Sequence, residues 1–255
     1  MEDFDWRSAS DADLERQYSP SQFSRRPLEE YIDEYKRLSG DAGNQLTLRR
    51  RGAPLLIYIH GGYWQQLSAA DSLFNAADAR HHGVSLAAVE YSLAPRATIE
   101  QIIEECVCEV MRFIEECAPS RVVLAGCSAG AHLVACCLQH DEVRERVDAA
   151  VFLSGIFDLR PLVRTTTNKA LHLDEPRAQR LSPMFFDFAG VPDCLVAVGG
   201  HEPPEFIRQS RDFAHVLGAE PVRVVDHRDH FDLPYDLLAV NSEVGDWVLA
   251  RLREN

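Results

Sequence analysis

One serine lies in a pattern that suits a nucleophile. Residues 126–130 read Gly-Cys-Ser-Ala-Gly, a G-x-S-x-G pattern, in which small neighbours let the chain turn sharply from a strand into a helix and expose the serine hydroxyl. The pattern alone is weak, since glycine and serine are common residues. Its context strengthens it, because the apolar segment Arg121–Gly126 is typical of a strand and Ala129–His140 of a helix. Ser128 is therefore the candidate nucleophile of an acyl-transfer reaction.

Two glycines suit the stabilisation of negative charge on the reacting oxygen. Gly61 and Gly62 directly follow Leu55–His60, an apolar run typical of a buried strand. Glycines at such a position let backbone N–H groups approach a developing oxyanion. The amide of Ala129, at the start of the helix after Ser128, is the other expected donor, helped by the positive end of the helix dipole. We therefore expect these three residues to form an oxyanion hole.

The general base is expected to be a histidine late in the chain. A serine in this kind of turn is followed along the chain by an acid and then by a histidine. Two histidines, His227 and His230, come after the predicted strand Val222–Asp226. His230 is favoured, because His227 lies nearer the end of the strand and fits a surface or loop role. A metal site is not expected, since no third ligand accompanies the pair.

The acid should follow the predicted strand Leu195–Gly199. Glu202 occupies that position, and Glu205 is the alternative. Asp232 lies too close to His230 in the sequence to be favoured, although it could orient the loop. The expected function of Glu202 is to hold the imidazole in the tautomer that accepts the serine proton.

Three residues near these groups are candidates for the substrate pocket. Cys127 precedes the serine, and the turn should direct its thiol into the protein, so we do not expect it to be the nucleophile. Tyr63 and Trp64, after the glycine pair, could form an aromatic-tolerant pocket with the segment 159–190. Core or lid packing explains these two aromatic residues equally well.

Short apolar strands alternate with helices along the chain. Further strands are predicted at Val84–Tyr91 and Ala149–Ser154. Further helices are predicted at Asp11–Tyr18, Pro27–Leu38, Thr98–Ala118, Phe206–Leu217 and Leu233–Arg253. This alternation implies a mostly parallel sheet covered on both faces. Residues 1–255 are predicted to form one domain, with 1–45 as an N-terminal arm and 159–190 as a short cap insertion.

Composition narrows the classes of partner. The formal net charge of −14 would repel a phosphate backbone, so no nucleic-acid partner is expected, and the cluster Arg49–Arg51 fits a solvated turn. No apolar run reaches the roughly 18 residues that span a bilayer, and the acidic N-terminus lacks the apolar core of a secretory signal. We therefore expect a cytoplasmic protein with no membrane partner. The seven cysteines include no C-x-x-C pair and are expected to be reduced and buried.

Taken together, motifs such as His60–Trp64, Glu90–Pro95 and Ser154–Leu162 resemble those of the kynurenine formamidase (arylformamidase) group of α/β-hydrolases, near the hormone-sensitive-lipase-like esterases. His60–Trp64 resembles the group's H-G-G-x-W oxyanion signature. The other similar stretches are Glu90–Pro95, Ser154–Leu162 with Asn168 and Leu171, Ser182-Pro183, Pro204–Phe206, Arg208–Ser210 and His230–Asp232. The resemblance runs from about residue 15 to the C-terminus and implies the α/β-hydrolase fold.

Two positions depart from the group's usual pattern. Cys127 stands where the group usually carries a histidine before the nucleophile, and Glu202 stands where it usually carries an aspartate. Glutamate is competent as the acid, so the set of Ser128, Glu202 and His230 is retained. The departures leave open a different amide or ester as the substrate, for example in a specialised biosynthetic pathway.

The resemblance implies a serine hydrolase that cleaves an aryl formamide such as N-formylkynurenine through an acyl-enzyme, with no cofactor and no metal. The expected partner is a small-molecule aryl amide or ester, and a homodimer is left open. A carboxylesterase acting on short-chain aryl esters is the alternative enzyme, since it would use the same groups. A non-catalytic binding protein of this fold is the alternative of another class, and it should lack one of the three groups that are present here.

Overall fold

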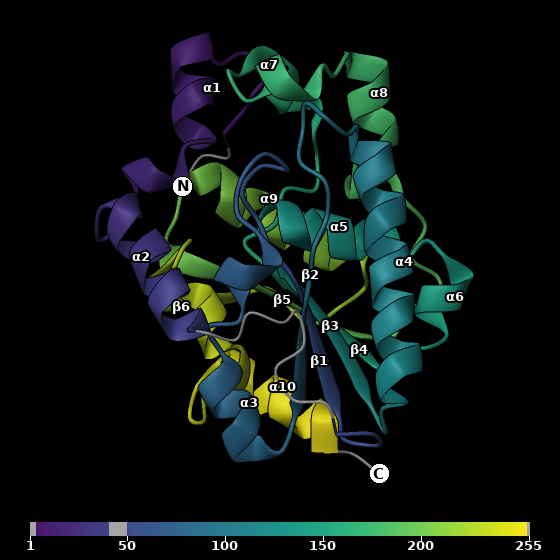
Figure 1. Ribbon diagram of the computed structural model, residues 1–255. Coiled ribbons are helices and arrows are strands. Elements are labelled where there is room, and N and C mark those ends of the chain that lie inside the picture. Colours follow the sequence, from purple (N-terminus) through teal and green to yellow (C-terminus); the bar gives the residue numbers. More distant parts are fainter. Residues whose placement is uncertain (1–3, 41–49, 254–255) are drawn as a thin grey trace.

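Six parallel strands form one sheet, in the order β2-β1-β3-β4-β5-β6 (Figure 1). The computed structural model describes residues 4–40 and 50–253. The strands are β1 Leu55–Ile59, β2 Ser85–Val89, β3 Val122–Cys127, β4 Ala149–Leu153, β5 Asp193–His201 and β6 Arg223–Asp229. Each neighbouring pair runs parallel, so the predicted α/β fold with a mostly parallel sheet is confirmed.

Helices cover both faces of the sheet, which explains why the central strands are apolar along their whole length. On one face lie α4 Ile99–Cys117, α5 Ala129–Cys137 and α9 Pro204–Val216, and on the other lie α3 Ala76–His82 and α10 Glu243–Arg253. Alternate side chains of β1 enter the two cores, Ile57 on one side and Leu56 on the other, and both are fully buried. The reactive groups at the strand ends therefore rest on a rigid, two-sided support.

The predicted helix Leu233–Arg253 is wrong in its first half. A 3-10 helix spans Leu233–Leu238, and α10 begins only at Glu243. Between them Asn241 has a φ of +62°, a conformation that interrupts a right-handed helix. The hydroxyl of Ser242 then caps α10 by accepting a hydrogen bond from the N–H of Gly245 at 2.9 Å. The helical spacing of apolar residues continues across the break, so periodicity did not reveal it.

The last strand is longer than predicted. β6 runs to Asp229 instead of ending at Asp226, so His227 lies within the strand. β6 is an edge strand that pairs only with β5, and its outer positions can therefore carry exposed polar side chains. Because those residues are polar, the sequence pattern there is typical of a loop.

Helix α5 is shorter than predicted. It ends at Cys137, before the predicted His140, and a short helix α6 follows at Asp141–Arg144.

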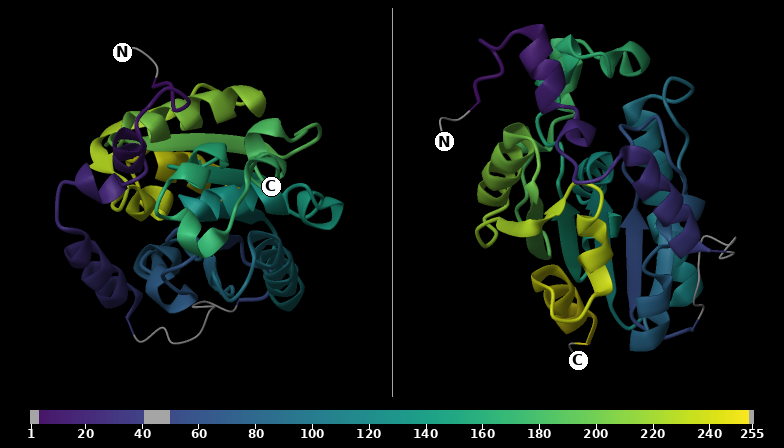
Figure 2. Two further views of the ribbon diagram at one scale, coloured as in Figure 1. Left: turned by 90° about the horizontal axis from the view of Figure 1, so that it is seen from above. Right: turned by 90° about the vertical axis from the view of Figure 1, so that its left-hand side faces the viewer.

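The N-terminal segment starts at one end of the molecule, where α1 lies beside segment 159–190, and continues along the side of the molecule near β6 (Figures 1 and 2). The N-terminal elements are α1 Asp11–Gln17, a 3-10 turn Pro20–Gln22 and α2 Leu28–Ser39. Segment 159–190 holds the 3-10 helix Arg160–Arg164, α7 Asn168–Leu171, α8 Glu175–Arg180 and the 3-10 turn Pro183–Phe185. Arg164 pairs with Asp11 at 2.6 Å, and the N–H of Thr166 donates to Glu15 at 2.8 Å. These contacts join the two segments.

Part of the predicted arm and Arg49 lie outside the described residues, whereas Arg50 and Arg51 are exposed. No helix in the described ranges is both long and apolar enough to cross a bilayer.

Candidate active site

Ser128 occupies a strained turn between β3 and α5. Its φ and ψ are +57° and −122°, which is unusual for a residue with a side chain. The two glycines of the G-x-S-x-G pattern are required by close packing around this turn. A Cβ on Gly130 would lie 2.0 Å from the carbonyl oxygen of Ile59, and one on Gly126 would lie 2.4 Å from the carbonyl oxygen of Gly130. The pattern therefore has a steric cause in this fold.

His230 and Glu202 form a buried pair. His230 follows the end of β6, and its Nδ1 lies 2.8 Å from Oε2 of Glu202. Only 5% of His230 and 4% of Glu202 is exposed, so water competes little for this contact. A carboxylate can only accept a hydrogen bond, so it holds the proton on Nδ1 and leaves the lone pair on Nε2.

The carboxylate of Glu202 is itself held by two further donors. The N–H of Gly199 donates to Oε1 at 2.8 Å, and the hydroxyl of Ser154 donates to the same oxygen. Ser154 is fully buried at the end of β4, next to β5. No pattern in the sequence predicted a role for Ser154 at the site. Adjacency of β4 and β5 in the sheet is the signal that could have found it.

The alternative candidates for the acid and the base do not belong to the Glu202–His230 pair. Glu205 is fully buried and pairs with Arg208 at 2.8 Å, and it accepts a hydrogen bond from the hydroxyl of Tyr18 at 2.9 Å. His227 is an exposed residue of β6. Asp232 accepts a hydrogen bond from the N–H of Asp229 at 2.7 Å, so it braces the turn that carries His230.

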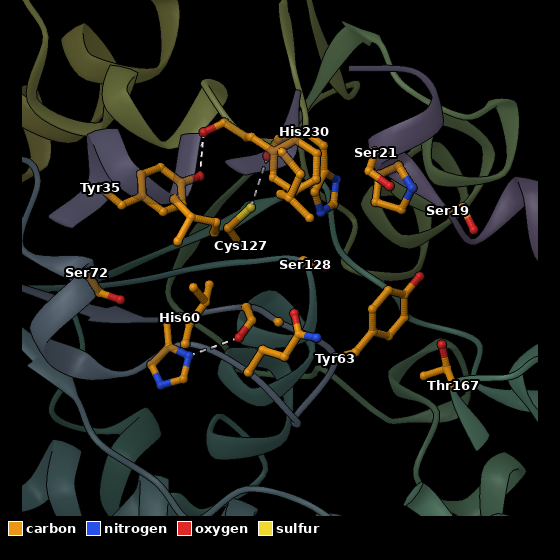
Figure 3. Close-up of a pocket in the computed structure, with 18 of the residues that line it drawn as sticks. Ser19, Ser21, Tyr35, His60, Tyr63, Ser72, Cys127, Ser128, Thr167 and His230 are labelled. Carbon is orange, nitrogen blue, oxygen red and sulfur yellow. Dashed lines mark hydrogen bonds between the residues drawn. The ribbon is translucent and has the colours of Figure 1, made fainter. Parts of the chain in front are cut away.

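Ser128 and His230 line the same cavity, together with Gly61 and Gly62 (Figure 3). The glycine loop approaches the serine closely: a Cβ on Gly61 would lie 2.9 Å from the carbonyl oxygen of Cys127 and 3.1 Å from Cβ of Ser128. Gly62 has a φ of +93°, in the region that favours glycine. Ala129 begins α5, so its N–H has no acceptor within the helix.

The cavity has a volume of about 270 Å³, and several aromatic rings contribute to its walls. Its aromatic lining residues are Tyr18, Tyr35, Tyr58, Tyr63, Phe74 and Phe231, along with the imidazoles. Much of one wall comes from the N-terminal segment, including Leu28 and Ile32 of α2. Segment 159–190 contributes Thr167. The contribution of the N-terminal segment to the cavity was not predicted from the sequence.

Of the three residues predicted for the substrate pocket, two line the cavity and one does not. Tyr63 and Cys127 line the cavity, and the hydroxyl of Tyr63 donates to the carbonyl of Tyr18 at 2.6 Å. Burial raises the pKa of the Cys127 thiol well above its usual range, which keeps it from acting as a thiolate. Trp64 is fully buried in the core, and its ring packs edge-on against His132 with centroids 5.0 Å apart. Trp64 therefore serves packing and not the pocket wall.

The cavity carries little positive charge. Among its described lining residues the charged groups are the carboxylate of Glu15 and the titratable imidazoles of His60 and His230, with neither lysine nor arginine. Burial lowers the pKa of His60 to about 4, so that imidazole is neutral near pH 7. In the described ranges no group of three or more His, Cys, Asp or Glu side chains is arranged to hold a metal ion.

The chain is similar to known proteins in sequence and in fold. The sequence profile of the α/β hydrolase fold family matches residues 56–230. Kynurenine formamidase of Salmo salar is 32% identical, over 97% of this chain and 96% of that protein. A solved structure from Silicibacter sp. TM1040, with a proposed thioesterase assignment, superposes with a TM-score of 0.81 at 24% identity, over 95% of this chain and 99% of that one.

A hormone-sensitive lipase from a metagenome library has the same fold, with a TM-score of 0.67 at 20% identity, over 96% of this chain and 99% of that one. At this level of identity the likeness to solved structures shows the fold, while the full-length match to the formamidase shows the closer kinship. The chain therefore belongs to the α/β-hydrolase family and is a homologue of the kynurenine formamidases.

Proposed function

We propose that the chain is a serine hydrolase in which Ser128, His230 and Glu202 act as a catalytic triad. One observation carries the proposal: the serine and the imidazole face one cavity, and the far nitrogen of that imidazole is bound by a buried carboxylate 2.8 Å away. A buried carboxylate that fixes the tautomer of a histidine lining the same cavity as a strained serine supports a role in acyl transfer.

The reaction follows from the roles of these groups. Nε2 of His230 accepts the proton of Ser128 as its oxygen attacks the carbonyl carbon, and the oxyanion is bound by the N–H of Gly61 or Gly62 and that of Ala129. As the carbonyl re-forms, the C–N or C–O bond to the leaving group breaks, His230 protonates the departing arylamine or alcohol, and the acyl group stays bound to Ser128. Water, deprotonated by the same imidazole, releases the acid and restores the serine. One oxyanion donor of this kind contributes about 3–4 kcal/mol to the transition state.

The substrate that we propose is an aryl formamide such as N-formylkynurenine, which would yield an arylamine and formate. The name of the full-length relative supports a formamide. The aromatic cavity supports a flat aromatic leaving group, since ring surfaces pack well against one another. The chemistry uses only side chains and backbone amides of the chain.

The test is a side-by-side measurement of kcat/KM on N-formylkynurenine and on short-chain aryl esters, with Ser128→Ala as the control. We expect turnover of the formamide that is lost in the variant. If the esters are hydrolysed but the formamide reacts only at the background rate, the protein is a carboxylesterase and not a formamidase. Equal labelling of wild type and Ser128→Ala by a fluorophosphonate would overturn the nucleophile, and no labelling of either would favour a non-catalytic binding protein.

A further inference from the structure

The turn that carries His230 is closed by two carboxylates. Oδ1 of Asp229 accepts hydrogen bonds from the N–H groups of Phe231 at 2.9 Å and Asp232 at 3.3 Å. In return Oδ1 of Asp232 accepts one from the N–H of Asp229 at 2.7 Å. These bonds lie within residues 229–232, so they fix the shape of the turn. They do not fix where the turn sits relative to the rest of the molecule.

The sheet supports this turn on one side only. β6 is the edge strand and pairs with β5 alone, and the pairing shifts its register between Gly199 and His201. An edge strand with an irregular ladder near its end is held less firmly than a central strand. Contacts outside the β5–β6 ladder therefore help to set the position of His230. Two of them reach the residue itself: its Nδ1 lies 2.8 Å from Glu202, and the thiol of Cys127 donates to its carbonyl at 3.8 Å.

The N-terminal segment contacts the residues before and after His230, mainly through α2. The hydroxyl of Tyr31 donates to Oδ2 of Asp229 at 2.5 Å, beside the N–H of Arg25 at 2.8 Å. Four residues along α2, the hydroxyl of Tyr35 donates to the carbonyl of Phe231 at 2.5 Å. Residues at this spacing share one face of a helix. The N-terminal segment is thus hydrogen-bonded to both neighbours of His230 in the chain, Asp229 and Phe231.

The electrostatics of Asp229 agree with a firm attachment. Burial by itself would raise the pKa of this carboxyl, but the hydrogen bonds from Arg25, Tyr31, Phe231 and Asp232 outweigh it and lower the pKa. The carboxylate is therefore charged near pH 7, and a hydrogen bond to a charged group is stronger than one between neutral groups.

We propose that Tyr31 is a positioning residue of the active site, whose hydroxyl acts through Asp229 to hold the imidazole of His230 in place for Ser128. This inference rests on the proposed function, because it needs His230 as the base. Tyr31 does not line the cavity, whereas Tyr35 does. Loss of the Tyr31 hydroxyl should therefore affect the chemical step and leave substrate binding unchanged. A displacement of about 1 Å between reacting groups can cost about 100-fold in rate.

The experiment compares Tyr31→Phe with a matched control, Tyr235→Phe. The hydroxyl of Tyr235 contacts Glu34 of the same helix at 3.4 Å. The ring of Tyr235 packs against Tyr35 and Phe74 of the cavity lining, and phenylalanine keeps that ring, so the control removes a hydroxyl that is not bonded to the His230 turn. Each variant is titrated with a fluorophosphonate to count competent serines, and kcat and KM are then measured on 4-nitrophenyl acetate per titrated site. Melting temperatures are recorded for both.

We expect Tyr31→Phe to lose about 10- to 100-fold in kcat and in the rate of fluorophosphonate labelling, with KM within about twofold of wild type. Tyr235→Phe should keep its kcat. An unchanged kcat per titrated site in Tyr31→Phe, or equal losses in the two variants, would overturn the positioning role. A wild type that the fluorophosphonate does not label at Ser128 would instead overturn the proposed function, so the two failures are distinguishable.

Discussion

Replacing Glu202 with glutamine tests the electrostatic design of the site with almost no change of shape. The carboxylate of Glu202 accepts from His230 on one oxygen and from Ser154 and Gly199 on the other. A glutamine must place its NH2 group on one of these two sides. The backbone N–H of Gly199 can only donate, so it keeps the amide oxygen on its own side. The NH2 group is then directed at Nδ1 of His230.

That arrangement selects the wrong form of the imidazole. Nδ1 must accept from the amide, so the proton moves to Nε2, which can then no longer take the proton of Ser128. In triads of this kind the corresponding change lowers kcat by about 10⁴-fold, or about 5.5 kcal/mol. We therefore expect Glu202→Gln to lose about 10⁴-fold in kcat, with KM and folding little changed.

The assay is steady-state hydrolysis of a chromogenic aryl ester by wild type, Glu202→Gln and Glu202→Asp, with melting temperatures recorded in parallel. Glu202→Asp is the matched control, because it keeps a carboxylate and is the residue that the homologous group usually carries. The aspartate variant should be clearly more active than the glutamine variant. A folded Glu202→Gln protein that retains more than a tenth of the wild-type kcat would refute the tautomer argument.

Three further predictions follow from the same contacts. Ser154→Ala removes one donor from the carboxylate of Glu202 and should lower kcat/KM on an aryl ester by about tenfold, since such a hydrogen bond contributes about 1.5–3 kcal/mol; an unchanged value would remove Ser154 from the site. The lowered pKa of Asp229 means that its charged form stabilises the fold above its ordinary pKa of 3.8 and that this contribution is lost as pH falls below it. The urea stability of wild type should therefore exceed that of Asp229→Asn at pH 7, with the gap closing toward pH 3, and a gap independent of pH would contradict this. Formanilide should be hydrolysed about tenfold faster than 2-formamidobenzoate at low salt, because the described cavity lining presents the carboxylate of Glu15 and no lysine or arginine. Added salt should reduce this difference in rate. Faster hydrolysis of 2-formamidobenzoate than of formanilide would contradict the prediction.

Local patterns in the sequence were enough to predict the fold and the family. The apolar strands and the glycines around Ser128 are features of neighbouring residues, and they have the same local causes in the structure: burial on both faces and a Cβ that would clash. Chain order was enough to propose His230 and Glu202, because successive parallel strands carry their loops to the same edge of the sheet. Those roles remain predictions for the experiments above.

The features that the sequence did not reveal depend on contacts between distant residues. The contacts from Tyr31 and Tyr35 to the turn at His230 join residues almost two hundred positions apart, and nothing in the spacing of α2 names its partner. The position of Trp64 after the glycine pair suggested a pocket residue. In the structure its φ is +59°, within a turn, and its ring packs in the core. The last residues of β6 could not be predicted as strand from their polarity, because an edge strand tolerates polar side chains.

The aromatic cavity draws much of its wall from residues that precede the sheet. The family profile matches residues 56–230, so a chain trimmed to that range would keep Ser128, Glu202 and His230. It would nevertheless lose Tyr18, Leu28, Ile32 and Tyr35, which line the cavity. If the proposed function holds, part of the surface that meets the substrate is therefore encoded upstream of the first strand, where a substitution can reshape the cavity without replacing any of the three reacting groups.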